Sequence, residues 1–286
     1  MTFLDVKTDY AFKKVFGTTE NKPLLIQFLN AIISFNDDAK IQDLEIVDPY
    51  TIPMLKGMKD TYVDVKAELD NNTKVIIEMQ VLNHKGFEKR VLYNIAKNYS
   101  TQLQKSQEYH LLNPVIALSI VDFIMFEDTT KVQSNFKLLE KEEFIDYSDD
   151  IELIFIELPK FKKELSELKN LQDKFIYFIK NAGSLELIPK ELEDISDALD
   201  VVNEASLSEE ELEIQHKRKE FMYIQKSALE LAQEQGLERG LEQGKIEIAK
   251  NLLDVLDNET IALKTDLPIQ TIEKLRDNKP KKENSL

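Results

Sequence analysis

The stretch Thr61–Val81, TYVDVKAELDNNTKVIIEMQV, decides the fold of this 286-residue chain. Polar and apolar residues alternate in both of its halves, as they do in a strand that buries one face. Asp70, Asn71 and Asn72 separate the halves, and these residue types favour tight turns. The stretch therefore predicts an antiparallel hairpin. One predicted face carries Val63, Val65, Ala67, Leu69, Val75, Ile77, Met79 and Val81, and the other carries Tyr62, Asp64, Lys66, Glu68, Lys74, Ile76, Glu78 and Gln80.

The register of the hairpin follows from pairing its two apolar faces, because a slip by one residue would expose one of them. The register that satisfies this condition places Leu69 opposite Thr73. Glu68 then faces Lys74, which is a favourable cross-strand pair of opposite charges.

The same register brings three polar side chains together. Asp64 faces Glu78, and Gln80 lies one step along the same strand face. Adjacent carboxylates repel, so they need a cation, a shared proton or a basic neighbour. Carboxylate and carbonyl oxygens are also the ligands that Mg²⁺ prefers. The pattern thus predicts a metal site, although the solvated face of an ordinary hairpin would look the same.

Several segments of the chain together resemble a known family. Asp64, thirteen residues and then Glu78-x-Gln80 resemble the motif of PD-(D/E)XK nucleases. The match is closer to the Rpn (recombination-promoting nuclease, or transposase-like) family, which has Gln where the wider superfamily has Lys. The other matching segments are TDYAFKKVFG (8–17), GFEKRVLYNIAKNYSTQL (86–103), YHLLNPVIALSIVDFIMF (109–126), IELIFIELPKF (151–161) and the Glu- and Gly-rich tail. Ser106 and Phe175 depart from the Gly and Trp expected there.

The resemblance implies an α/β fold: a restriction-endonuclease-like core, with a mixed central sheet flanked by helices, followed by an all-helical C-terminal extension. It also implies a metal-dependent DNA endonuclease associated with recombination or mobile elements. Asp64, Glu78 and the main-chain carbonyl of Met79 would bind Mg²⁺, which Mn²⁺ or Ca²⁺ can replace. Gln80 would orient the attacking water, so the catalytic candidates are Asp64, Glu78 and Gln80.

Helices are predicted on both sides of the hairpin in the sequence, over residues 8–16, 22–34 and 87–109. Lys13 and Arg90 are candidate phosphate contacts on these helices; Arg90 could instead contact a carboxylate, and both could simply belong to solvated basic faces. Asp9 is interpreted as a cap of the first helix, with an outer-sphere acid as the alternative. Residues 114–126 and 151–158 are predicted to be buried strands.

The chain is predicted to have four parts: a nuclease-like domain (1–182), a helical extension (183–244), a small helix-turn-helix-like tail (245–278) and a disordered end (279–286). The repeat QEQG, LERG, LEQG places Gly236, Gly240 and Gly244 along one helical stripe. Such a stripe lets another backbone approach, which predicts a homo-oligomer formed through the C-terminal helices. A charged linker helix is the alternative.

Charge and composition narrow the partners, metal sites and cellular location that fit this chain. The net charge is −16, but residues 1–126 hold 14 basic and 16 acidic residues, so the acidity lies in the remainder. The predicted catalytic half is therefore compatible with DNA, although it has no strong basic footprint. Cysteine is absent and the three histidines are scattered, which argues against a zinc site. With neither a signal-peptide pattern nor a membrane-spanning segment, the protein is predicted to be cytoplasmic.

Two other functions fit parts of the sequence. The first is a catalytically weak or inactive nuclease-fold protein that assembles with partners through its acidic helical tail. The second is a carbohydrate-acting enzyme with Asp64 and Glu78 as paired acid and base, which would need a cleft lined by aromatic residues.

Overall fold

The computed structural model describes residues 2–35, 39–51 and 61–278, which fall into two compact units, one up to Lys219 and the other from Glu220. The helices are α1 (Asp9–Phe16), α2 (Lys22–Ile32), α3 (Phe87–Ser100), α4 (Leu171–Asn181), α5 (Ser196–Val201), α6 (Glu209–Leu252), α7 (Asn258–Thr265) and α8 (Ile269–Asp277). The strands are β1 (Leu44–Ile46), β2 (Tyr50–Thr51), β3 (Thr61–Tyr62), β4 (Val65–Leu69), β5 (Lys74–Gln80), β6 (Val115–Val121), β7 (Gln133–Leu139) and β8 (Asp146–Glu157). The predicted disordered end, 279–286, lies outside the described residues.

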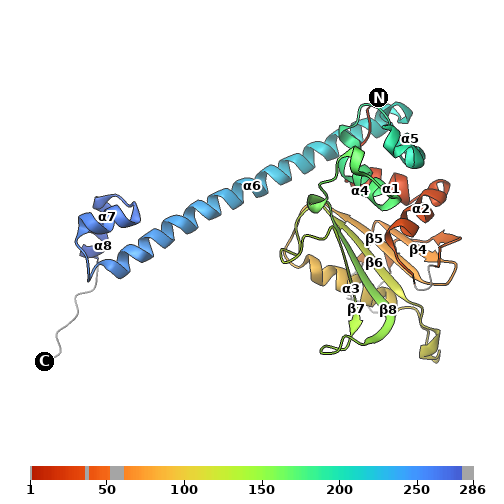
Figure 1. The fold of residues 1–286 in the computed structure, drawn as a ribbon, viewed down its shortest axis with the longest axis horizontal. Helices are drawn as coiled ribbons and strands as arrows, with labels where there is room; N and C mark the ends of the chain where they lie inside the picture. Colours follow the sequence, from red (N-terminus) through yellow and green to blue (C-terminus); the bar gives the residue numbers. More distant parts are fainter. Residues whose placement is uncertain (1, 36–38, 52–60, 279–286) are drawn as a thin grey trace. The chain divides into compact units, whose positions relative to one another are not determined.

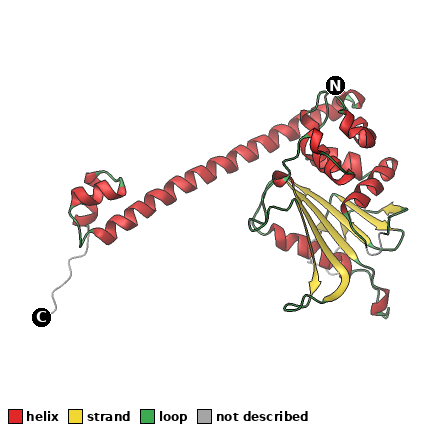
Figure 2. Ribbon diagram, in the orientation of Figure 1, coloured by secondary structure: helices red, strands yellow, loops and turns green. Residues whose placement is uncertain are grey.

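The first unit is built on a mixed six-stranded sheet of order β1-β4-β5-β6-β8-β7 (Figures 1 and 2). The pairs β1/β4, β4/β5 and β7/β8 are antiparallel, whereas β5/β6 and β6/β8 are parallel. Helix α3 makes the crossover between the parallel strands β5 and β6, as parallel neighbours require. The expected α/β fold with a mixed central sheet and C-terminal helices is confirmed.

Helices cover both faces of this sheet. Helices α1, α2, α4 and α5 pack on one face around a large core that includes Phe12, Phe28 and Phe175. Helix α3 packs on the other face through Phe87, Val91 and Ile95, in a smaller core. Every residue of β6 is buried, because this central strand is covered on both sides.

The predicted hairpin is present, and its register is confirmed. Glu68 pairs with Lys74, and the Leu69 amide donates to the Thr73 carbonyl. The predicted face of Val63 is wrong: Val65 packs on the α1 side of the sheet, but Val63 packs on the α3 side. The reason is that the first strand is interrupted after Tyr62 and resumes at Val65, so the alternation does not continue through residues 63 and 64.

Other boundaries also differ from the prediction. Strand β8 begins at Asp146 rather than near residue 151, because it pairs with β7, a strand that its sequence did not reveal. Helix α3 ends at Ser100 instead of reaching residue 109. In the loop that follows, Ser106 has a φ of 74°, in the left-handed region that explains why glycine is expected there.

The second unit packs the end of α6 against α7 and α8. Its core contains Ala249, Leu253, Ile261, Leu267 and Ile272. Residues 266–268 join α7 to α8. That the two helices form a helix-turn-helix-like tail stays a prediction. In the described part of the chain, no helix is both long and apolar enough to cross a bilayer.

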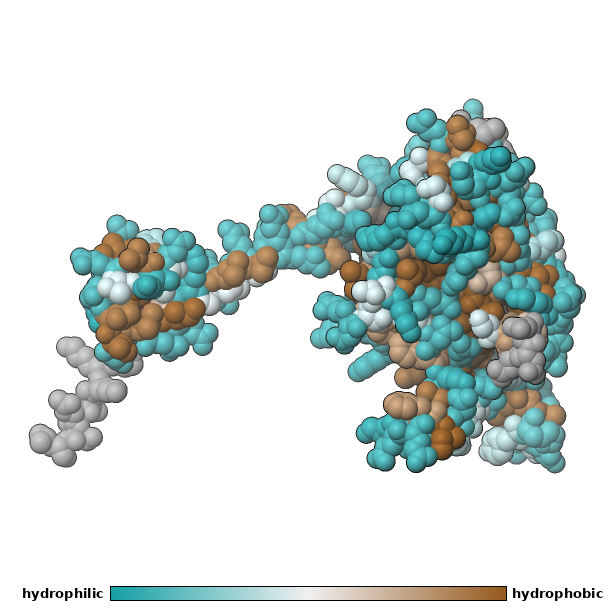
Figure 3. Space-filling view, in the orientation of Figure 1, coloured by the Kyte–Doolittle hydropathy of each residue, from teal (hydrophilic) through white to brown (hydrophobic). Residues whose placement is uncertain are grey.

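The part of α6 that belongs to the second unit exposes large apolar side chains, which contribute to the brown areas of Figure 3. They include Phe221, Ile224, Leu231, Leu237 and Leu241. A Cβ added at Gly236, Gly240 or Gly244 would meet no atom within 4 Å, so the glycine stripe is open.

Candidate functional site

Asp64 lies in the short break between β3 and β4, and strand β5 fixes its position. Its amide donates to the carbonyl of Ile77 (3.1 Å), and its carboxylate Oδ2 accepts from the amide of Met79 (2.8 Å). The Asp64 side chain is only 14 % exposed. The interruption of the strand therefore frees this carboxylate from the regular alternation and directs it across the end of β5.

A lysine from the first helix reaches Asp64. The Lys13 Nζ atom lies 3.3 Å from Asp64 Oδ1 and 2.6 Å from Asp9 Oδ1, and 5.0 Å from the ring centre of Tyr62. The interpretation of Asp9 as the helix cap is wrong. Thr8 is the cap, because its hydroxyl accepts from the Ala11 amide, and Asp9 is free to pair with Lys13 one turn later.

Glu78 and Gln80 lie near the end of β5 and share one basic partner. The guanidinium of Arg90 pairs with Glu78 Oε1, and its Nη2 group also donates to Gln80 Oε1 (2.6 Å). The Gln80 amide nitrogen donates to the carbonyl of Leu82 (2.9 Å). Arg90 is in the first turn of α3, directly after the loop from β5, so it takes the carboxylate contact that the sequence left open.

Burial dominates the electrostatics of the two carboxyl groups. It raises the pKa of Asp64 to about 7, with a further rise from Asp9, although the Met79 amide and Lys13 favour the charged form. Burial likewise raises the pKa of Glu78 above its usual range, against the opposing effect of Arg90 and His84. Both carboxylates are therefore costly to ionise unless a cation is near.

For Lys13 and Asp9, charged neighbours outweigh burial and favour the charged forms. Burial alone would lower the pKa of Lys13, but Asp9 and Asp64 raise it above its usual value. Burial alone would raise the pKa of Asp9, but Lys13, Asp64 and Arg218 lower it. Lys13 is thus held as a cation at neutral pH.

The structure gathers the predicted site residues into two groups. Asp64 and Lys13 meet on the α1 side of the sheet, together with Asp9 and Tyr62. Glu78, Gln80 and Arg90 meet on the α3 side, where Glu78 also lines a small, mostly apolar pocket with Val63, Ile76, Val91, Asn94, Ala117 and Ser119.

The donor set suits a hard divalent cation. Among the described residues, no cluster of three or more His, Cys, Asp or Glu side chains is placed to hold a metal. Magnesium does not need one, because one or two carboxylates completed by carbonyl oxygen and water are its usual ligands. Asp64 and Glu78, which are largely buried and lie in the two separate groups beside the main chain of Met79, supply carboxylates of this type.

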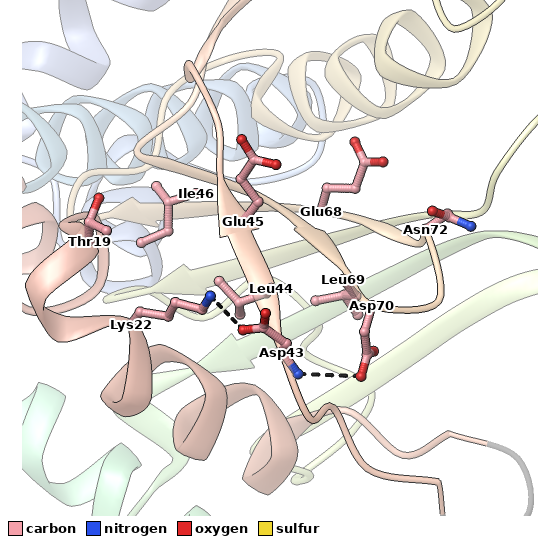
Figure 4. A pocket seen from close by; sticks show the side chains of 10 residues that line it. All are labelled: Thr19, Lys22, Asp43, Leu44, Glu45, Ile46, Glu68, Leu69, Asp70 and Asn72. Carbon is pink, nitrogen blue, oxygen red and sulfur yellow. Dashed lines mark hydrogen bonds and ion pairs between the residues drawn. The ribbon is translucent and has the colours of Figure 1, made fainter.

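A roomier pocket of about 580 Å³ lies elsewhere in this unit, against the edge strand β1 (Figure 4). Lys22 points to Asp43 across it, at 2.5 Å, and the Asp43 amide donates to Asp70 (3.3 Å). Its lining includes neither Asp64 nor Glu78, and no aromatic residue among those described. It is therefore unsuited to be the site of the paired carboxylates or a sugar-binding cleft.

Sequence reasoning missed the ion pair between Lys13 and Asp64. The local signal was present, because Asp9 and Lys13 are four residues apart and so adjacent on a helix. What the sequence could not supply was the packing of α1 beside the break before β4. Arg218, which bonds to Asp9 (3.1 Å), gave no signal at all.

Comparison with known proteins supports the resemblance. Residues 6–232 match the family model described as "PD-(D/E)XK nuclease family transposase". No curated protein and no solved structure matched the chain.

Proposed function

The chain belongs to the PD-(D/E)XK nuclease family transposases, and we propose that it is a metal-dependent DNA endonuclease that hydrolyses phosphodiester bonds. The observation that carries this proposal is the pair of largely buried carboxyl groups, Asp64 in the break before β4 and Glu78 on the neighbouring strand β5. Largely buried acids that are each paired with a basic side chain are typical of functional sites, where burial and charged neighbours shift pKa values.

Asp64, Glu78 and the carbonyl of Met79 are the residues that would hold Mg²⁺, with Mn²⁺ or Ca²⁺ able to replace it. A bound ion of this kind polarises a phosphate and lowers the pKa of a coordinated water. The protein's part is to fix the ligands. The Met79 amide donates to Asp64 and Arg90 pairs with Glu78, so each proposed ligand is held by a contact of its own.

Gln80 is proposed to orient the attacking water. A glutamine side chain has two N–H donors and two carbonyl lone pairs. Arg90 and the Leu82 carbonyl use one of each, so one donor and one acceptor remain for the water. Gln80 cannot serve as an ordinary general base, and its role is therefore positional.

Lys13 and Arg90 are proposed to contact the phosphate. Asp9 and Asp64 engage two of the three N–H groups of Lys13, which leaves one for a phosphate oxygen. The Arg90 side chain is 35 % exposed and has donors beyond the Nη2 group that binds Glu78 and Gln80. DNA would bind to the first unit where Lys13 and Arg90 can reach its phosphates, in recombination or mobile-element movement.

We also propose self-association through the C-terminal helices. The open glycine stripe of α6 and the exposed leucines beside it support a close helix–helix contact. Sedimentation of the purified full chain would test this, and a monomer at high concentration would exclude it.

The test of the nuclease is nicking of supercoiled plasmid by wild-type protein, Asp64→Ala and Glu78→Ala, with Mg²⁺, Mn²⁺, Ca²⁺ or chelator. Metal-dependent nicking should be lost in both variants. Glu68→Ala is the matched control, because this carboxylate belongs to the same hairpin but pairs with Lys74 instead. Circular dichroism should show that all three variants keep the fold. Nicking that persists in both site variants would contradict the assignment.

A second function is favoured by one observation: each of the two carboxylates has a basic partner within the protein itself. In this alternative the ion pairs are permanent, and the protein has little or no activity and acts in assembly through its acidic tail. Calorimetry with Mn²⁺ separates the two functions, since permanent pairs would leave no metal binding that depends on Asp64.

A further inference from the structure

The first three turns of α6 run along α1. Glu211 of α6 bonds to Tyr10 and to Lys14, whose Nζ atom is 3.0 Å from Glu211 Oε1. Gln215, one turn later, is buried, with its Oε1 atom 3.5 Å from the Thr8 hydroxyl. Arg218, almost one turn further, donates to Asp9 (3.1 Å).

These contacts come from one face of α6, because residues at such spacing are neighbours on a helix. All of them lie within the unit Met1–Lys219. Gln215 is buried beside the cap of α1, and Glu211 pairs with Lys14 of α1, so the part of α6 that carries Arg218 lies against α1. Arg218 therefore projects from a part of α6 that packs against α1.

Asp9 is the centre of a continuous series of charges. Its Oδ2 atom accepts from Arg218, and its Oδ1 atom lies 2.6 Å from Lys13 Nζ. Lys13 in turn lies 3.3 Å from Asp64. The two Asp9 oxygens are thus engaged separately, and a lysine side chain, which is long and flexible, is restrained at its end.

We propose that Asp9 and Arg218 are positioning residues: Arg218 fixes the Asp9 carboxylate, and Asp9 fixes the Lys13 ammonium against Asp64. The inference rests on the proposed nuclease function. It assigns the beginning of α6 to the active site, rather than to the C-terminal extension alone.

The first test compares Arg218→Met with Lys217→Met in plasmid nicking by the full chain. Lys217 is the matched control, because it precedes Arg218 on α6 but pairs with Glu213 of the same helix (2.7 Å). Arg218→Met should lower kcat about fivefold with KM unchanged, since an exposed ion pair is worth about 1 kcal/mol at most. Arg218→Lys should restore part of the loss. Equal kcat values for Arg218→Met and Lys217→Met would overturn the inference.

The second test asks whether Arg218 acts through Asp9. Asp9→Asn should lower kcat about tenfold, and adding Arg218→Met in that background should change it no further. A purely structural role of α6 would instead make the two losses multiply, which would also overturn the inference. Thermal unfolding of each variant shows whether the fold is intact.

A third readout does not depend on cleavage. Mn²⁺ binding by calorimetry should be about threefold tighter in Arg218→Met than in Lys217→Met, because a less restrained Lys13 competes less for Asp64. Equal affinities would contradict the positioning role even if the protein cleaves DNA. Conversely, wild-type protein that binds Mn²⁺ but never nicks would refute the nuclease and leave the positioning role testable. Wild-type protein without Mn²⁺ binding would refute both.

Discussion

The two carboxylates of the site receive their basic partners from opposite faces of the sheet. Glu78 receives Arg90 from α3, which follows β5 after a short loop, so this side is assembled by one continuous segment. Asp64 receives Lys13 from α1, near the start of the chain, and that lysine is in turn connected to α6 through Asp9. The α3 side is therefore local, whereas the α1 side depends on packing between distant elements.

The two sides should differ most in the stability that is lost when the basic side chain of each is removed. Arg90→Met leaves Glu78, whose side chain is only 14 % exposed, without its charged partner. Because an uncompensated buried charge is costly, the free energy of unfolding at pH 7 should fall by about 2 kcal/mol. Urea denaturation measures this loss.

The double variant Arg90→Met, Glu78→Gln is the control for that interpretation. It removes the charge along with its partner, so it should regain much of the lost stability. If the double variant is as unstable as the single one, the loss comes from packing of the arginine on the Phe87 ring, 5.3 Å away, and not from the ion pair.

Lys13→Met should have a smaller effect on stability, about 1 kcal/mol or less at pH 7. Asp64 keeps its bond from the Met79 amide, and Asp9 keeps its pair with Arg218, so neither carboxylate loses every partner. Urea denaturation again gives the value. A loss equal to that of Arg90→Met would show that the two sides of the site are energetically alike.

Much of the α3 side could be predicted from the sequence. Alternation over 65–80 fixed the register of the hairpin, and helical spacing placed Arg90 one turn into the next helix. These are short-range patterns, in which a residue's position in its own element decides its neighbours. The same logic failed at Val63, because a single interrupted strand ends the period of two on which it depends.

For the α1 side, the separate elements could be predicted but the contacts between them could not. Helix α1 was expected within one residue of its bounds, yet its contact with Asp64 comes from tertiary packing that no local pattern encodes. The same holds for β7, whose exposed residues give no clear alternation of burial. Arg218 is separated from Asp9 by most of the first unit, so their pairing required the fold itself.

The smallest predicted effect concerns the second contact between α6 and α1. Bonds from Tyr10, the Ser208 amide and Lys14 lower the pKa of Glu211 to about 2, from an ordinary value of 4.5. A lowered pKa means that the carboxylate stabilises the fold above pH 4.5, and that this contribution is lost as the pH falls towards 2. Because Glu211 is one-third exposed, the contribution should be only about 0.5 kcal/mol.

Glu211→Gln should therefore be less stable than wild type at pH 7, and the difference should shrink between pH 4.5 and pH 2. Urea denaturation across that range measures it, with Glu213→Gln as a control whose carboxylate contacts only its own helix through Lys217. A difference that does not change with pH would mean that Glu211 stabilises the fold through its packing rather than through its charge. Among the described residues, the α1 side of the site would then depend on α6 through Arg218 and Gln215, with the charge series as its electrostatic connection to that helix.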